Sequence, residues 1–307
     1  MPLPYRWQLR VDRLKNSLRG LFGGGEQQPR PQICPACGSL VGISATKCHE
    51  CGTNLTFSLV ALGRSLGGFI SAEAPITYLV FVINILLFVV SMLATNKQQG
   101  GANIFGGISG QVLLEFGASQ PLAIQSGEWW RLVMPMFLHI GLLHFGMNTM
   151  ALLDFGPRVE STYGSPRFLF LYVFTGIFGF VTSVIWNFYW RGGHGVSAGA
   201  SGALCGLLGV ILGTTIGQKG RQAQETRSQM TRMIIYLVIM GFFFSVDNAA
   251  HFGGLVCGLL FGKLFAERLP MNQKEIKRAY LLGFAAGIIV IASFAMMLLH
   301  LKEYSGG

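Results

Sequence analysis

The feature that most restricts the fold of this chain is a series of seven long apolar runs. An α-helix needs about 20 apolar residues to cross a bilayer, and several of the runs reach that length. Only 12% of the residues are charged and 51% are apolar, which excludes a soluble globular protein. We therefore predict an all-α polytopic membrane protein. The runs cover 75–94, 132–153, 167–189, 202–217, 232–246, 249–267 and 280–300.

The fourth run, 202–217, is too short for a full crossing. Such a helix begins below the membrane surface, where a loop is tolerated only if protein or a water-filled cavity covers it. Ser201 then lies at a buried helix N-terminus, where free backbone N–H groups favour an anionic oxygen. This place suits a nucleophile. In a chain with 42 glycines, however, a Gly-x-Ser-Gly string also arises by chance.

His251 stands at the start of another apolar run. An ionisable side chain inside a membrane segment is costly and is therefore a functional candidate. Rows of glycine on this run and on the run after Ser201 allow the two helices to approach backbone to backbone. The contact would bring the imidazole within hydrogen-bond distance of the hydroxyl, as a general base requires. The glycines are Gly254, Gly258 and Gly262, and Gly202, Gly206, Gly209 and Gly213.

Three polar side chains stand in the second run, at its expected outer end. These are His139, His144 and Asn148, and the last two share a helical face at spacing i, i+4. Both can donate hydrogen bonds, so together with the backbone N–H of Ser201 they suit an oxyanion hole. The alternative is that they form interhelical hydrogen bonds that only hold the bundle together.

Two further boundaries have a simpler interpretation. Tryptophan beside arginine at the end of a span, here Trp129, Trp130 and Arg131, is typical of an interface anchor. Asp247 is four residues before His251, at the expected outer boundary, so we predict a solvated side chain. We assign no third carboxylate to the serine–histidine pair.

Before the first apolar run the chain is polar and basic. Residues 5–22 have the pattern of a basic amphipathic helix that lies on an anionic membrane, although a solvated basic tail fits equally well. Two C-x-x-C-G motifs follow, and four thiolates at this spacing suit a structural zinc ion with no open position for catalysis. Reduced thiolates place this module in the cytosol. The predicted zinc ligands are Cys34, Cys37, Cys48 and Cys51.

The distribution of charge sets the orientation. With the cysteine module in the cytosol, seven spans place the C-terminus outside. All but four of the 23 Lys and Arg residues then lie on the cytosolic side, as the positive-inside rule predicts. The formal charge of +10 therefore reflects topology, and we expect no nucleic acid partner. The four exceptions are Lys97, Arg131, Arg191 and Lys302.

Taken together, these motifs resemble those of the rhomboid intramembrane serine proteases, in the same order, over roughly residues 75–267. The resemblance implies a six-helix core with a Ser201–His251 dyad, and a seventh helix that some members carry. One position departs from the pattern, because Cys205 stands where the family often has an aromatic ring on the histidine. The matching residues are Trp130, Arg131, His139, His144, Asn148, Gly156 to Glu160, Gly199, Ser201, Gly202, Ala250, His251, Gly254 and Gly258.

The resemblance implies an endopeptidase that cuts transmembrane proteins near the outer membrane boundary and needs no cofactor for catalysis. We expect a multi-pass protein of a bacterial plasma membrane, with a cytosolic partner for the zinc module. Two other functions stay open: a rhomboid-like protein that binds membrane clients without cleaving them, and a small transporter that uses intramembrane histidines. The polar residues gather at one face instead of crossing the membrane, which disfavours the transporter.

The sequence thus predicts five segments. A basic amphipathic segment comes first, followed by a zinc-ribbon-like module, a juxtamembrane linker, the six-helix core, and an inner linker with the seventh transmembrane helix. Their predicted bounds are 1–30, 31–56, 57–74, 75–267 and 268–307.

Overall fold

The computed structural model divides into two compact units, 1–69 and 70–307, which we treat separately. In the first unit, β1 (Gln32–Ile33) and β2 (Leu40–Val41) form an antiparallel pair. The predicted amphipathic helix and the four cysteines predicted to bind zinc lie outside the described residues. The structure describes residues 32–33, 40–42, 45, 49–50, 74–99, 107–243, 246–265 and 269–305.

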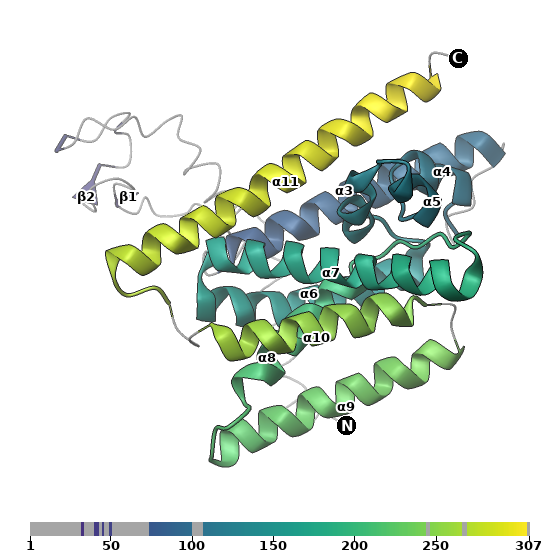
Figure 1. Ribbon diagram of the computed structural model, residues 1–307. Coiled ribbons are helices and arrows are strands. Elements are labelled where there is room, and N and C mark those ends of the chain that lie inside the picture. The colour runs from purple at the N-terminus through teal and green to yellow at the C-terminus, as the bar shows by residue number, and fades with distance from the viewer. Residues whose placement is uncertain are drawn as a thin grey trace, which may run out of the picture. The chain divides into compact units, whose positions relative to one another are not determined.

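Within the described residues of the second unit, the regular elements are helices, and loops connect them (Figure 1). Three of them are long and apolar enough to cross a membrane: α3, residues 165–190 of α7 and residues 273–301 of α11. The predicted all-α membrane class is therefore supported. The elements are α3 (Pro75–Gln99), α4 (Gly110–Glu115), α5 (Pro121–Gln125), the 3₁₀ helices η1 (Trp129–Leu132) and η2 (Met134–Phe137), α6 (Leu142–Tyr163), α7 (Ser165–Arg191), α8 (Ser201–Thr214), α9 (Arg221–Phe243), α10 (Asn248–Leu264) and α11 (Gln273–Ser305).

Helix α8 is buried along most of its length, between α10, α7 and α6. Its residues are apolar on every side, as expected for a helix surrounded by protein. Fourteen residues rise only about 21 Å, whereas the apolar core of a bilayer is about 30 Å thick. The prediction of a short central helix is thus confirmed, and its first residue is Ser201.

The predicted contact between two rows of glycine is also confirmed. A Cβ atom built on Gly254 would lie 2.0 Å from the carbonyl oxygen of Gly202, and one on Gly258 would lie 1.9 Å from that of Gly206. Real Cβ atoms do not approach so closely, so only glycine permits this packing of α10 on α8. The contact brings the N-terminus of α10 beside the N-terminus of α8.

The second predicted span differs from the structure. The run at 132–153 was expected to be one helix, but η1 and η2 occupy its beginning and α6 starts only at Leu142. Pro135 lacks a backbone N–H and Gly141 precedes the first helical residue, so a regular helix does not form before that point. Helix α6 also continues past the end of the apolar run, so the Gly156–Glu160 motif lies inside it.

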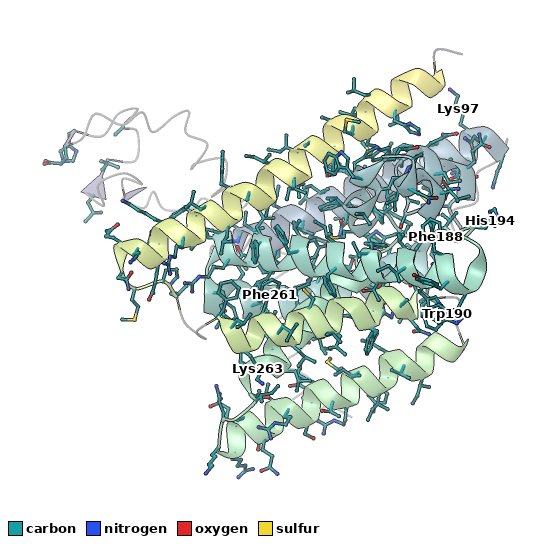
Figure 2. The ribbon with its side chains drawn as sticks, viewed as in Figure 1. Lys97, Phe188, Trp190, His194, Phe261 and Lys263 are labelled. Carbon is teal, nitrogen blue, oxygen red and sulfur yellow. The ribbon has the colours of Figure 1, made fainter. Side chains whose placement is uncertain are left out.

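Other helices extend beyond their apolar runs, α9 and α11 most clearly. Hydropathy marks only the part of a helix that suits lipid, whereas backbone hydrogen bonds continue into polar sequence. Arg221 and Glu225, for example, form an ion pair of 2.7 Å in the polar first turns of α9. Figure 2 shows Lys97 and His194 at one end of the helical unit and Lys263 at the other.

A buried carboxylate joins α6 to α3. Glu160, which is 1% exposed, accepts hydrogen bonds from the backbone N–H groups of Ile76 and Thr77 at 2.9 and 2.8 Å, and from the Thr77 hydroxyl at 2.7 Å. The first N–H groups of a helix carry partial positive charge and have no partner in the helix, so an anion there is stabilising. These three hydrogen bonds hold the start of α3 against the last turns of α6.

Candidate active site

The structure brings Ser201 and His251 together although fifty positions separate them. Ser201 is the first residue of α8, and His251 lies in the first turn of α10. The distance from Ser201 Oγ to His251 Nε2 is 2.7 Å. A neutral imidazole with its proton on Nδ1 accepts the hydroxyl proton at Nε2. This arrangement can generate an oxygen nucleophile at a helix N-terminus.

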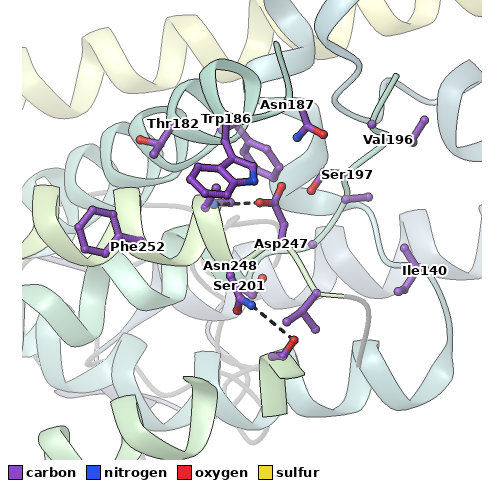
Figure 3. Close-up of a pocket in the computed structure, with 18 of the residues that line it drawn as sticks. Ile140, Thr182, Trp186, Asn187, Val196, Ser197, Ser201, Asp247, Asn248 and Phe252 are labelled. Atoms are coloured by element: carbon purple, nitrogen blue, oxygen red, sulfur yellow. Dashed lines mark hydrogen bonds between the residues drawn. The ribbon is translucent and has the colours of Figure 1, made fainter. Parts of the chain in front are cut away.

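A cavity of about 940 Å³ opens beside this pair. Figure 3 shows Ser201 and Asp247 in its wall together with apolar side chains, among them Trp186 and Phe252. His144 lines the cavity as well. The volume is sufficient for a short stretch of peptide, because ligand pockets for drug-sized molecules measure about 300–1,000 Å³.

His144 approaches the serine over Gly199. A Cβ atom on Gly199 would lie 2.5 Å from His144 Cε1 and 3.5 Å from Ser201 Oγ, and Gly199 has a φ of +148° that L side chains rarely adopt. Glycine is therefore required here for space and for backbone conformation. The N–H of Gly199 donates to the carbonyl of Pro135 at 2.9 Å. This hydrogen bond joins the loop before Ser201 to η2.

Asn148 is buried one turn beyond His144 on α6. Its Nδ2 donates a hydrogen bond of 2.8 Å to the carbonyl of His144, so one amide hydrogen is used inside the helix. Among the described residues its Oδ1 has no hydrogen-bond partner. The side chain amide therefore keeps one hydrogen available for another acceptor.

His139 supports His144 from behind. It lies between η2 and α6, is 1% exposed, and its ring centroid is 5.6 Å from that of His144. Phe145 packs edge to face against the ring of His139, with the two ring centroids 5.2 Å apart. His139 thus packs against a ring of the site but is not among the residues that line the cavity.

The prediction of a solvated Asp247 is wrong. Asp247 is half-buried at the N-cap of α10, where Oδ1 accepts from the N–H of Ala250 at 2.9 Å and Oδ2 accepts from the hydroxyl of Ser183 on α7. Asn187, one turn further along α7, donates to the carbonyl of Ser183 at 2.9 Å. Aspartate directly before an apolar helix is a common capping signal, and it was available in the sequence.

The interpretation of Trp130 and Arg131 as interface anchors is also wrong. Both are buried, at 1% and 4% exposure, and only Trp129 is exposed. The Arg131 guanidinium donates to the carbonyl of Leu114 at 2.7 Å and to Glu128 at 2.6 Å. The arginine therefore organises the segment that connects α3 with α6, which a pattern of spans and boundaries does not reveal.

Cys205 is buried on α8, and no aromatic ring stacks on His251 within the part of the chain that the structure describes. The same residues contain no group of three or more His, Cys, Asp or Glu side chains that could hold a metal ion.

Comparison with known proteins gives one family. The Rhomboid domain matches residues 126–268. Rhomboid protease GluP of Bacillus subtilis is 37% identical over 229 residues, which are 72% of this chain and 41% of that protein. RHOMBOID-like protein 5 of Arabidopsis thaliana is 36% identical over 183 residues, 58% of each. Putative rhomboid protease YdcA of Bacillus subtilis is 33% identical over 148 residues, 48% of this chain and 72% of that protein.

The similarity extends over only part of some of these relatives. The chain spans less than two thirds of GluP and of RHOMBOID-like protein 5. The matched domain contains α6 to α10 with the serine and the histidine, whereas α3 and α11 lie outside it.

Proposed function

The chain belongs to the rhomboid family, and we propose that it acts as an intramembrane serine protease on transmembrane protein substrates. The observation that carries this proposal is the 2.7 Å distance from Ser201 Oγ to His251 Nε2 at the wall of a 940 Å³ cavity. The names of two relatives, GluP and YdcA, include the word protease. The reaction is hydrolysis of a peptide bond through an acyl-enzyme.

In the first half of the reaction, His251 accepts the hydroxyl proton while Ser201 Oγ attacks the peptide carbonyl. The new C–O bond gives a tetrahedral intermediate with a negative oxygen. His251 then donates its proton to the nitrogen as the C–N bond breaks, and the amine leaves. In the second half a water molecule gives a proton to His251 and attacks the ester carbonyl. His251 then returns the proton to Ser201 Oγ as the bond between the acyl carbon and Oγ breaks, which releases the acid and restores the serine.

The negative oxygen needs hydrogen-bond donors. The N–H of Ser201 is one, because it opens helix α8 and has no carbonyl within the helix. His144 reaches the same place over Gly199. Asn148 contributes its second amide hydrogen, because the first is donated to the backbone carbonyl of His144. Donors of this kind act strongly where water is excluded.

The proposed arrangement in the membrane follows the predicted topology. Helices α3 and α6 to α10 form the six-helix core and α11 is an additional span, with the N-terminus in the cytosol and the C-terminus outside. The site then lies near the outer face of a bacterial plasma membrane. A helical substrate must unwind before it is cut, since its carbonyls are engaged in helical hydrogen bonds, so helix-breaking residues near the cut are expected.

A fluorophosphonate probe, which reacts with activated serines, tests this function. We expect labelling of the purified protein and loss of labelling in Ser201→Ala, with cleavage of a reconstituted transmembrane substrate lost in parallel. Ser161→Ala is a matched control, because Ser161 is exposed at the far end of α6. If the parent protein binds the substrate but neither cleaves it nor takes the label, the alternative of a client-binding protein is correct.

We also propose that the N-terminal module binds one structural zinc ion through Cys34, Cys37, Cys48 and Cys51. Its support is the C-x-x-C-G spacing and the β1–β2 pairing, which flanks the segment with the first two cysteines. Metal analysis tests it: we expect one zinc per chain, and none after Cys34→Ser with Cys37→Ser. The proposed role is docking of a cytosolic partner.

A further inference from the structure

Helix α11 lies outside the matched domain but contacts the helical core both near its beginning and near its end. Near its beginning, a Cβ atom on Gly283 would lie 2.8 Å from Cα of Pro166, so α11 lies directly on the start of α7. Near its end, α11 contacts η1 and α4, and Figure 1 shows this half of the yellow helix near α4. The second contact is the one that leads toward the candidate site.

His300 makes that contact. Its Nε2 lies 3.1 Å from Nη2 of Arg131, and its ring centroid lies 5.4 Å from the ring of Trp130. Arginine has donors only, so the imidazole must be the acceptor and carries its proton on Nδ1. The last turns of α11 are thereby bonded to the arginine that organises the α3–α6 connection.

Arg131 also binds the backbone of the segment between α3 and α6. Nη1 donates to the carbonyls of Leu114 and Ala118 at 2.7 and 3.2 Å. With only 4% of its surface exposed, the guanidinium is oriented by these two carbonyls, by Glu128 at 2.6 Å and by His300. Its position therefore determines where Ala118 and the following residue lie.

Ser119, the next residue, is paired with the serine loop. Its N–H donates to the carbonyl of Ser197 at 2.8 Å, and the N–H of Ser197 donates back to Ser119 at 3.0 Å. Ser197 lines the cavity, two residues before Gly199 and four before Ser201. An unbroken series of bonded groups thus runs from α11 to the cavity wall.

We propose that α11 holds the serine loop, residues 195–199, in its working position through His300, Arg131 and the Ser119–Ser197 pair. His300 is a positioning residue: it touches no reacting atom, and it acts by orienting Arg131. The inference rests on the proposed function, because a substrate has to occupy the cavity whose wall this loop forms. Loosening the loop weakens substrate binding more than it weakens the chemistry of the dyad.

The test compares three variants of the full-length protein. His300→Phe keeps an aromatic ring beside Trp130 but has no acceptor, and His300→Gln restores an acceptor oxygen. Leu299→Ala changes a neighbouring side chain that is 58% exposed, and it serves as the control. Amide hydrogen exchange is measured over residues 114–119 and 195–199, and KM and kcat are measured with a reconstituted transmembrane substrate.

We expect faster exchange in both segments for His300→Phe only, and a fall in kcat/KM of about 2- to 30-fold, mainly through KM, as for other coupling residues. His300→Gln should resemble the parent. Parent-like exchange in a folded His300→Phe, or equal effects of Leu299→Ala, would overturn the proposal. A parent without Ser201-dependent cleavage contradicts the proposed function instead, and the exchange data still decide the role of α11.

Discussion

At the scale of single residues, the reactivity of Ser201 depends on neighbours from separate parts of the chain. His251 comes from α10, His144 from α6, and Gly199 from the loop before α8. In the proposed mechanism their roles differ: His251 is the base, His144 is a hydrogen-bond donor, and Gly199 leaves the space that lets the donor approach. Effects on turnover must therefore be separated from effects on the stability of the fold.

The dyad should behave as one unit. We expect Ser201→Ala and His251→Ala each to lower turnover by about 10⁴-fold or more, and the double variant to be no slower than either single one, because each change alone removes the same nucleophilic pathway. Turnover of a reconstituted transmembrane substrate measures this, with thermal melting as a control for folding. If the two losses multiplied in the double variant, the residues would act independently.

Asn148→Ala should lower kcat by about 10- to 1,000-fold, since loss of one oxyanion donor has effects of this order. The side chain also bonds the carbonyl of His144 inside α6, so melting has to be measured on the same samples. A fall in kcat at an unchanged melting temperature supports the oxyanion role. A loss of activity that follows the loss of folded protein supports the alternative, a bond that only stabilises the bundle.

At the scale of elements, the start of α10 is held by a cap that also reaches α7. Asp247→Ala removes both bonds of the carboxylate, and we expect a loss of about 0.5–2 kcal/mol in the free energy of unfolding. Asp247→Ser keeps a capping oxygen and should recover most of this stability. Chemical denaturation of the two variants measures the difference, and equal stabilities would show that the cap contributes little.

The glycine contact of α8 with α10 allows a comparison in which the sign of the effect is informative. Gly258→Ala places a methyl group 1.9 Å from a backbone oxygen of α8, so the helices must separate, and we expect a loss of about 1–3 kcal/mol together with loss of serine labelling. Gly146→Ala on α6 meets nothing within 4 Å and should stabilise by up to about 1 kcal/mol. Thermal melting decides, and a neutral Gly258→Ala would contradict the close packing.

At the scale of the whole molecule, the chain divides at residues 69 and 70. We expect that removal of residues 1–69 leaves both the melting temperature of the helical unit and the fluorophosphonate labelling of Ser201 close to those of the parent. Both are measured on membrane-inserted protein, with the full chain as reference. A parallel fall in melting temperature and labelling would mean that the N-terminal unit supports the helical core.

Several features of the fold and the candidate site were predictable because they depend on local sequence. Runs of apolar residues mark helices that suit lipid, the shortness of the run after Ser201 predicts a short helix, and glycine rows predict close packing. Helix bounds were less predictable, as α6 shows: Pro135 and Gly141 stand in an apolar run, and hydropathy does not register backbone geometry.

The sequence by itself thus determined the membrane class and the short helix after Ser201, since each follows from the composition or length of one segment. That Ser201 and His251 meet was expected from rows of glycine on two segments and from the family resemblance. Tertiary structure alone decided the contacts of Arg131 and His300, and the hydrogen bond between Asp247 and Ser183 on α7. The hydrogen bonds from Arg131 to Ala118, from Ser183 to Asp247 and between Arg131 and His300 join residues 13, 64 and 169 positions apart. A buried charged or polar side chain takes whichever partners the folded chain places around it, and no local pattern specifies those partners.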